Sequence, residues 1–404
     1  MPYVESYFYN RDHSINISDF VIIIPIGQLS AAIGRLFVGH CIRYIYPYWI
    51  FLFGSIFINI GMFFCSYITN PTLFCWAYGL FLGGLPAFTF LPTVWNLWNH
   101  FPTNKGKVNG ILLAGVNFGP VIFSFIYTMI ANPYNNDAET VENDGQEKQK
   151  VFGDFVSERV PMTIRWGAII SLFLCFIGYI FLPKTKGKNN LGSDNKEIPT
   201  LTFTDMLRNC NAWNIFFLLA TTSSGTVYLQ SMYKVLGMIY INDDHFISFI
   251  GSAGFAIGCV GQLIFGFLYD KFQLKRVLVI CLLVSLVFMI TFNVSLSNKL
   301  MFSMYFLVLS FVNSSIYNGI LLQGAKDFPK DRWVFSYASN SLVIPFALPY
   351  VFQRFITPII GYFSTLLILS GIIGIGVVQV LIHPDTDVRK NVVEVEKQEF
   401  LDKD

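Results

Sequence analysis

Long apolar stretches alternate with short polar segments along most of the chain. Because a membrane-spanning helix needs about 20 mainly apolar residues, this pattern predicts eleven spanning helices. The stretch 71–95 is interrupted by Gly83-Gly84, Pro86 and Pro92, which spanning helices tolerate where neighbours satisfy the backbone. The eleven helices are expected near residues 19–42, 48–68, 71–95, 108–131, 161–183, 211–238, 246–268, 276–295, 300–323, 333–353 and 357–383.

Two longer polar segments interrupt the apolar pattern. Residues 132–160 are rich in Asp and Glu, whereas residues 184–210 contain four lysines and one arginine. The second segment separates five predicted helices from six, which indicates a linker between two halves. The predicted divisions are a first half of five helices (1–183), a linker (184–210), a second half of six helices (211–383) and a tail (384–404).

A glycine motif occurs twice in the chain. The stretch Gly34-Arg35-Leu36-Phe37-Val38-Gly39 returns far downstream as Gly261-Gln262-Leu263-Ile264-Phe265-Gly266, and Phe101-Pro102 returns at the same spacing as Phe328-Pro329. A constant spacing across two motifs indicates a duplicated module, and many secondary transporters are duplicated bundles of apolar helices.

The two copies of the motif differ in their place within each half. The first copy ends the first predicted helix, whereas the second copy ends the second helix of the later half. The first half is therefore expected to lack its opening helix, either because the start codon is misassigned or because the protein has lost that helix. We expect an in-frame apolar stretch of about 20 residues to be encoded upstream of Met1.

Composition agrees with a membrane protein. The chain is 54% hydrophobic and 17% aromatic, and only 13% of its residues are charged, compared with about 25% in soluble domains. Of the 27 Lys and Arg residues, 18 lie on the side of the predicted linker, six on the other side and three inside helices. Because positive loops stay in the cytosol, the linker and the C-terminus are expected to be cytosolic.

The second copy of the motif continues into a charged loop. Gly266-x-x-x-Asp270-Lys271-x-x-x-Lys275-Arg276 resembles the loop signature of the major facilitator superfamily. The resemblance implies an all-α, multi-pass membrane protein, a bundle of two pseudo-symmetric halves. Eleven spanning helices would then be the superfamily's twelve without the first.

A second set of motifs resembles one branch of that superfamily, the oxalate/formate antiporters and monocarboxylate carriers. The branch implies antiport or monocarboxylate transport. The motifs are Pro92-Thr93, Phe101-Pro102-x-x-Lys105-Gly106-x-x-x-Gly110, Ala114-Gly115-x-x-x-Gly119, Asn132-Pro133 and Arg159-Val160-Pro161.

The signature residues have a physical reading. Gly34, Gly39, Gly261 and Gly266 let helices approach closely. An acid such as Asp270, followed by basic residues including Lys271 and Arg276, can pair with a neighbouring helix terminus and hold one gating state. In the first half Arg43 occupies the position equivalent to Asp270. Only the second half is therefore expected to have a working clamp.

Arg35 is the first candidate for binding a substrate. A charge inside an apolar segment costs about 2.5–3.5 kcal/mol on insertion scales and is normally kept for a pathway. An arginine without a protein partner can hold a carboxylate with two parallel hydrogen bonds. The alternative is a structural arginine whose head reaches the membrane surface.

Four more residues are candidates for the same site. Monocarboxylate carriers have a substrate-binding arginine at the position of Gln262 and an acid one turn earlier, where this chain has Gly258. Gln262 is either a cavity residue or a packing residue. Lys234 is either a second cation of the site or a residue at the outer membrane surface. In the penultimate helix, Tyr337 and Asn340 offer polar contacts.

No motif for catalysis, ATP binding or a metal is present, and the seven cysteines show no metal-binding spacing. We therefore expect no enzyme, cofactor or nucleic-acid partner. The predicted function is secondary active transport of a small organic anion, similar to a monocarboxylate, by alternating access. The alternatives are transport of a neutral or zwitterionic solute such as an amino acid, and a transport-inactive sensor or scaffold. A monomer in the bilayer of the plasma membrane or an organelle is expected.

Overall fold

The computed structural model describes residues 2–13, 20, 22–42, 44–134, 136, 139–141, 149–184, 201–241, 244–296, 298–328, 331 and 333–383. A helix lies at each of the eleven predicted segments. These helices are α2 (Ile23–Cys41), α3 (Pro47–Cys65), α4 (Pro71–His100), α5 (Lys105–Ala131), α7 (Val160–Phe181), α9 (Cys210–Tyr240), α10 (Asp244–Lys271), α11 (Leu274–Ile290), α13 (Lys299–Asp327), the pair α14 (Trp333–Ala338) and α15 (Val343–Val351), and α16 (Thr357–Ile382).

Eight segments within the described residues are long and apolar enough to cross a membrane. The other three of the eleven are α2, α9 and α11. Of these, α11 has only 17 residues, and α2 and α9 contain polar positions such as Arg35 and residues 221–226. The number of eleven spans therefore stays a prediction, while the helical architecture is observed.

Several short elements were not predicted. An antiparallel hairpin joins β1 (Glu139–Val141) to β2 (Gln149–Val151), and the N-terminal residues form α1 (Pro2–Tyr9). The aromatic residues of α1 account for its docking, because Phe8 is buried and its ring stacks 5.2 Å from that of Phe20. The remaining short helices are α6 (Asp154–Ser157), α8 (Phe203–Arg208) and α12 (Phe292–Ser295).

The helix starts repeat with nearly the spacing of the sequence motifs. Pro47 begins α3, and Leu274, which follows it at the spacing of the glycine motif, begins α11. The starts of α4 and α13, and those of α5 and α14, match the same spacing to within one position. Four of the helices in each half thus follow one repeat, since the glycine motif lies in α2 and α10. The predicted domain boundaries themselves stay a prediction.

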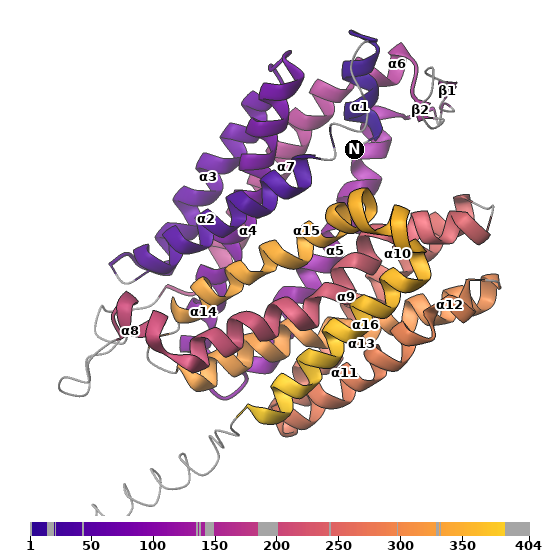
Figure 1. The fold of residues 1–404 in the computed structure, drawn as a ribbon. Coiled ribbons are helices and arrows are strands. Elements are labelled where there is room, and N and C mark those ends of the chain that lie inside the picture. The colour runs from indigo at the N-terminus through magenta and orange to yellow at the C-terminus, as the bar shows by residue number, and fades with distance from the viewer. Residues whose placement is uncertain are drawn as a thin grey trace, which may run out of the picture.

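The helices form two groups in space (Figure 1). One contains α2, α3, α4 and α7, and the other contains α9 to α16. They meet where α5 packs against α10 and where α2 packs against α14 and α15. We call the end of the bundle that carries α8 the linker side, and the opposite end, with α1, α6 and the β1–β2 hairpin, the hairpin side (Figure 1).

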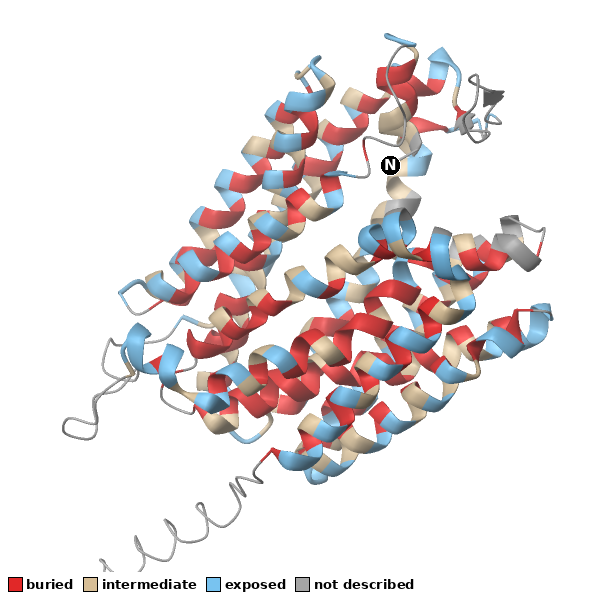
Figure 2. Ribbon diagram, viewed as in Figure 1, coloured by how far each residue is buried: buried red, intermediate tan, exposed pale blue. Residues whose placement is uncertain are grey.

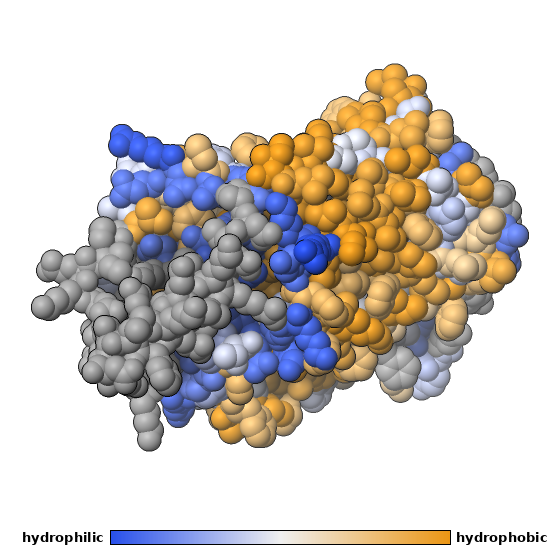
Figure 3. Space-filling model, turned by 90° about the horizontal axis from the view of Figure 1, so that it is seen from below, coloured by the Kyte–Doolittle hydropathy of each residue, from blue (hydrophilic) through white to orange (hydrophobic). Residues whose placement is uncertain are grey.

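Buried residues lie between the helices, and large apolar residues lie on the outer surface. The main buried cluster runs through the second group of helices (Figure 2). On the outside, Phe181 is 80% exposed and Ile359 is 82% exposed. Seen from below, apolar residues form a broad area while hydrophilic ones gather at one end (Figure 3). An apolar surface of this extent is unusual for a soluble monomer and suits a lipid environment.

Candidate functional site

A cavity of about 350 Å³ lies between the two groups of helices. Its wall comes from α2, α4 and α5 on one side and from α9, α10, α13 and α15 on the other. A space of this size matches the lower end of small-molecule sites. The lining residues are Gln28, Arg35, Pro86, Ala87, Phe90, Leu91, Leu113, Val116, Asn117, Ser223, Thr226, Val227, Gln230, Gly254, Phe255, Gly258, Gln262, Ser310, Asn313, Ser314, Ile316, Tyr317, Leu342 and Phe346.

Arg35 is the one charged side chain among the described residues that line the cavity. It is 7% exposed. Its Nε donates a hydrogen bond of 3.2 Å to Oδ1 of Asn340, which belongs to the second half. Its Nη2 is buried and has no hydrogen-bond partner among the described residues. One edge of the guanidinium is therefore held in place through Nε, and the N–H groups of Nη2 remain available to a ligand.

The local backbone brings Asn340 to Arg35. Between α14 and α15 the chain tightens into a short 3₁₀ turn, η3 (Ser339–Leu342). A 3₁₀-helix has three residues per turn, whereas an α-helix has 3.6. Its side chains are therefore rotated relative to those of the flanking α-helix. The hydroxyl of Ser339 donates to the carbonyl of Ser336 at 2.9 Å, within the same turn. Asn340 thereby reaches a partner 305 residues away in the sequence.

Gln262 faces the same cavity from α10. It is 5% exposed, and its Oε1 is buried without a hydrogen-bond partner among the described residues. Because Gln262 and Arg35 both occupy the second position of the glycine motif, they are equivalent positions of the repeat. The structure therefore brings the two equivalent residues to one cavity, one from each half.

Sequence reasoning missed several polar residues of the cavity wall. Gln28 precedes Arg35 by seven residues, which is two helical turns, so both lie on one face of α2. Asn117 and Gln230 approach from α5 and α9, and Asn313 from α13. The signal available in the sequence was a single polar side chain inside an otherwise apolar run. Thr226 belongs to a polar stretch of α9, and its Oγ1 is also buried without a partner in the described chain.

Two predicted binding residues are not among the described residues that line this cavity. Tyr337 lies outside the cavity lining, and its ring packs 5.2 Å from Trp333 and 5.3 Å from Phe203 on the linker side. Tyr337 lies in α14, two residues before η3, and packs in this aromatic cluster, so contact with substrate stays a prediction for it. Lys234 lies in α9, and its side chain falls outside the described residues.

Asp270 caps the beginning of α5 from the other half. Its Oδ1 accepts a 2.8 Å hydrogen bond from the backbone N–H of Gly106, and its Oδ2 accepts one of 2.9 Å from that of Lys107. The first N–H groups of a helix have no partner inside the helix, and the helix dipole favours a negative charge there. The acid thus forms a clamp between α10 and α5.

Two of the three basic residues of the signature contribute less than Asp270 does. The ammonium group of Lys271 lies 4.5 Å from the centre of the Phe267 ring, in the same helix. Arg276 is exposed near the start of α11. Within the described part of the chain, neither residue is seen to join the two halves, so the clamp depends on the carboxylate.

The four glycines of the motif serve two kinds of close contact. A Cβ at Gly34 would lie 2.8 Å from the Cβ of Ala87 in α4, and Gly261 meets Ser314 of α13 in the equivalent way, with both partners shifted by the spacing of the repeat. The other two glycines face the opposite half. A Cβ at Gly39 would lie 2.9 Å from the Cβ of Ser336, and one at Gly266 would lie 2.6 Å from the carbonyl oxygen of Gly106.

The acid at the beginning of α14, the helix equivalent to α5, makes different contacts. Asp331 lies two residues before this helix begins and is 7% exposed. Its Oδ1 accepts a 3.0 Å hydrogen bond from the Trp333 indole N–H, and its Oδ2 accepts one of 3.3 Å from the backbone N–H of Leu201 in the linker. Arg43, the first-half equivalent of Asp270, lies outside the described residues.

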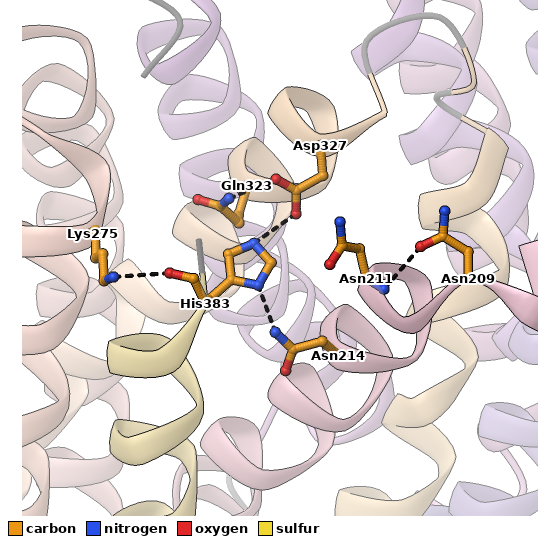
Figure 4. A network of polar contacts seen from close by, with 7 residues as sticks. All are labelled: Asn209, Asn211, Asn214, Lys275, Gln323, Asp327 and His383. Atoms are coloured by element: carbon orange, nitrogen blue, oxygen red, sulfur yellow. Dashed lines mark hydrogen bonds and ion pairs between the residues drawn. The ribbon is translucent and has the colours of Figure 1, made fainter. Parts of the chain in front are cut away.

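A buried polar network joins helix ends on the linker side of the second half (Figure 4). Nε2 of His383 lies 2.8 Å from Oδ2 of Asp327, and Nδ1 of His383 lies 2.5 Å from Nδ2 of Asn214. Lys275, from the signature loop, donates to the carbonyl of His383 at 2.9 Å. Gln323 donates to the other oxygen of Asp327 at 2.8 Å. The network ties α9, α11, α13 and the end of α16 together within one half.

Comparison with known proteins shows which family has this architecture. The model of the family described as Major Facilitator Superfamily matches residues 1–344. The chain is also similar to the uncharacterized MFS-type transporter YhjX of Escherichia coli (strain K12), with 23% identity over 242 residues, or 58% of this chain and 52% of the relative. The chain thus aligns with about half the length of that relative.

The superfamily consists of transporters rather than enzymes, in agreement with the prediction that the chain is not an enzyme. Together with the eight apolar helices, the family match identifies an integral, multi-pass membrane protein. The chain belongs to the Major Facilitator Superfamily.

Proposed function

We propose that this protein is a secondary active transporter of a small organic anion, similar to a monocarboxylate. The observation that carries the proposal is Arg35, which is buried at the central cavity with an unpartnered Nη2. A desolvated guanidinium without a carboxylate partner is stabilised by an anion that supplies one. The absence of acidic residues from the described lining leaves that place to the substrate.

The single positive charge of Arg35 also limits how many negative charges the substrate can carry. One guanidinium neutralises one carboxylate, and a second carboxylate in the same cavity would have to be desolvated without a partner. Burial of an unpaired charge costs several kcal/mol. The charge of the described lining therefore favours a monocarboxylate over a dicarboxylate.

Alternating access is the mechanism that the contacts between the halves support. Asp270 clamps α5, and Gly39 meets Ser336. Arg35 bonds to Asn340, which also crosses between halves. These contacts close the bundle between the cavity and the linker side. In the proposed cycle they separate and re-form, exposing the cavity first to one side and then to the other.

The linker side is proposed to face the cytosol, on the basis of the positive residues that gather there. Cys210, which is exposed at the start of α9, offers a test. A membrane-impermeant maleimide should label it only after the cell is permeabilised, with Cys210→Ser as the control for labelling of other thiols. Labelling of Cys210 on intact cells would reverse the proposed orientation.

Uptake into proteoliposomes tests the transport proposal. Labelled lactate, pyruvate, formate and oxalate should be compared, together with alanine as a zwitterion. The monocarboxylates are expected to accumulate, and oxalate to be a poor substrate. Failure of every anion to move would overturn the substrate class.

Arg35 variants make this experiment specific. Arg35→Lys keeps the charge but loses the two-donor fork. A hydrogen bond to a charged group contributes about 1.5–3 kcal/mol, so anion affinity should fall about ten- to hundredfold. Arg35→Gln copies Gln262 and should bind anions at least as weakly. Wild-type affinity in both variants, at matched membrane levels, would remove Arg35 from the site.

A neutral or zwitterionic solute is the second candidate, because the cavity also has the amides of Gln28, Asn117, Gln230 and Gln262. In that case alanine should be transported in preference to lactate, and Arg35→Lys should be nearly silent. A third candidate, a transport-inactive sensor, predicts ligand-dependent thermal stabilisation without flux.

A further inference from the structure

The two equivalent residues of the repeat present opposite hydrogen-bonding needs to one cavity. Nη2 of Arg35 is a buried donor without an acceptor, and Oε1 of Gln262 is a buried acceptor without a donor, among the residues that the structure describes. Both side chains are more than nine-tenths buried and line the same space. A substrate carboxylate has acceptors for Arg35 but no donor for Gln262. A ligand that satisfies both residues must therefore carry two different groups.

We propose that the substrate is a hydroxymonocarboxylate, whose carboxylate pairs with Arg35 and whose hydroxyl donates a hydrogen bond to Oε1 of Gln262. The inference rests on the proposed transport of an organic anion, and adds the requirement for a hydrogen-bond donor. It assigns Gln262 the role of selecting among anions that Arg35 binds alike.

The selectivity follows from what different anions leave unsatisfied. A water molecule can pair with Gln262 while the cavity is empty, and a ligand that displaces it must replace its hydrogen bond to keep affinity. An unsubstituted acid offers no donor, and the oxygen of a keto acid is only an acceptor. Sites that hydrogen-bond a substrate hydroxyl reject analogues lacking it, because their buried polar groups are then left unpaired. The hydroxy acid alone among these three satisfies Oε1.

The hydroxyl group of a third cavity residue is consistent with this assignment. Thr226 lines the cavity from α9, and its Oγ1 is also buried without a partner among the described residues. A hydroxyl both donates and accepts. Thr226 can therefore donate to the oxygen of the substrate hydroxyl, while that hydroxyl donates its hydrogen to Gln262.

Binding of a matched series of four-carbon acids to the full chain in detergent tests the proposal. The probes are butyrate, 2-, 3- and 4-hydroxybutyrate, 2-oxobutyrate and acetoacetate, and the readout is the dissociation constant from calorimetry. The hydroxybutyrates move the donor along the chain one carbon at a time. At least one of them should bind about tenfold or more tightly than butyrate and than both keto acids.

Two variants assign the preference to Gln262. Gln262→Met keeps the side-chain length and removes both polar groups, so the preference for the hydroxy acid should disappear while butyrate still binds. Gln28→Met is the matched control, since Gln28 lines the same cavity and is not among the buried unpartnered groups. In this control the preference should persist. Both variants replace a polar group by an apolar one of similar size, so folding is checked by monodispersity and thermal stability.

The outcomes separate the two proposals. Equal binding of butyrate and all hydroxybutyrates would overturn the role of Gln262 while leaving anion transport standing. Survival of the preference in Gln262→Met would do the same. Binding of none of the six anions would overturn the proposed monocarboxylate function and this inference with it.

Discussion

The beginnings of α5 and α14 are equivalent in the repeat, but they are stabilised in different ways. The first amides of α5 are capped by Asp270, which reaches across from the other half. At the beginning of α14, Asp331 precedes the helix in the same half. Its carboxylate accepts hydrogen bonds from the indole of Trp333 and from the backbone N–H of Leu201 in the linker. One acid therefore joins the two halves, and the other joins the linker to the second half.

This difference shows how one architecture can close with a single clamp. Both copies of the repeat have a glycine contact between the halves, at Gly39 in the first copy and at Gly266 in the second. The charged cap between halves is seen, among the described residues, only at Asp270. Lys275 and His383 likewise act inside the second half. Opening of the linker side should therefore break one charged clamp, two glycine contacts and the hydrogen bond between Arg35 and Asn340, while the linker stays attached to α14.

The largest effect is expected from loss of the clamp between halves. Asp270→Asn removes the charge and one of the two acceptor oxygens, at a cost of about 1.5–3 kcal/mol. The linker-closed form should then lose about ten- to hundredfold in relative population, and transport should slow or stop without loss of membrane insertion. Initial uptake rate at matched membrane level is the measurement.

Asp331→Asn is the matched control for this prediction. It keeps an acceptor for the Trp333 indole, and its bonds lie within the second half and the linker. Transport should fall less than in Asp270→Asn. Equal losses in the two variants would mean that the two acids have the same role, and normal transport in Asp270→Asn would show that the clamp does not control the cycle.

A smaller effect is expected from the glycine contacts. In Gly266→Ala the new Cβ would lie 2.6 Å from the backbone oxygen of Gly106, so α5 and α10 must separate on the linker side. Overpacking of this kind costs about 1–3 kcal/mol. Reduced transport should accompany greater protease sensitivity of the linker side. Gly371→Ala, where no atom lies within 4 Å, should behave as wild type.

Gly39→Ala extends the same comparison to the other half. Its Cβ would meet the Cβ of Ser336 at 2.9 Å, a side-chain atom rather than backbone, so a milder defect is expected than in Gly266→Ala. A more severe defect at Gly39 would contradict the view that the α5–α10 contact is the tighter of the two.

The smallest effect concerns the linker helix α8. Asp205 and Thr202 form a capping box at its start, and the hydrogen bonds from Thr202 lower the pKa of Asp205 below its ordinary value of 3.8. A lowered folded pKa means that the stabilisation is present above pH 3.8 and is lost as the pH falls through the folded pKa. Hydrogen–deuterium exchange in α8 should rise at that acidic pH before it rises in α13.

Asp205→Asn at pH 7 should reproduce this loosening of α8, with uptake near the wild-type rate. Because Met206 of α8 is buried against the main cluster, Met206→Ala is a positive control that should release the helix further. Unchanged exchange in Asp205→Asn would show that Met206, rather than the capping box, holds α8.

Much of the fold followed from local patterns in the sequence. Apolar stretches of about 20 residues placed the helices, because each such helix satisfies its own backbone and depends little on distant residues. The constant spacing of the duplicated motifs identified Arg35 and Gln262 as equivalent, and the charged loop suggested that Asp270 would pair with a helix end. Short elements such as α1 and the β1–β2 hairpin escaped because their formation depends on docking against other segments.

The composition of the site was decided by tertiary structure. The pairing of Arg35 with Asn340 joins residues 305 positions apart through a 3₁₀ turn, and no helical period predicts such a contact. Tyr337, three residues from Asn340, was directed away to an aromatic cluster. Periodicity shows which side chains share a face of one helix, but which faces meet across a cavity depends on how the helices pack. For that reason the sequence identified the residues at equivalent positions, and only the packed structure brought their unpaired donor and acceptor to the same cavity.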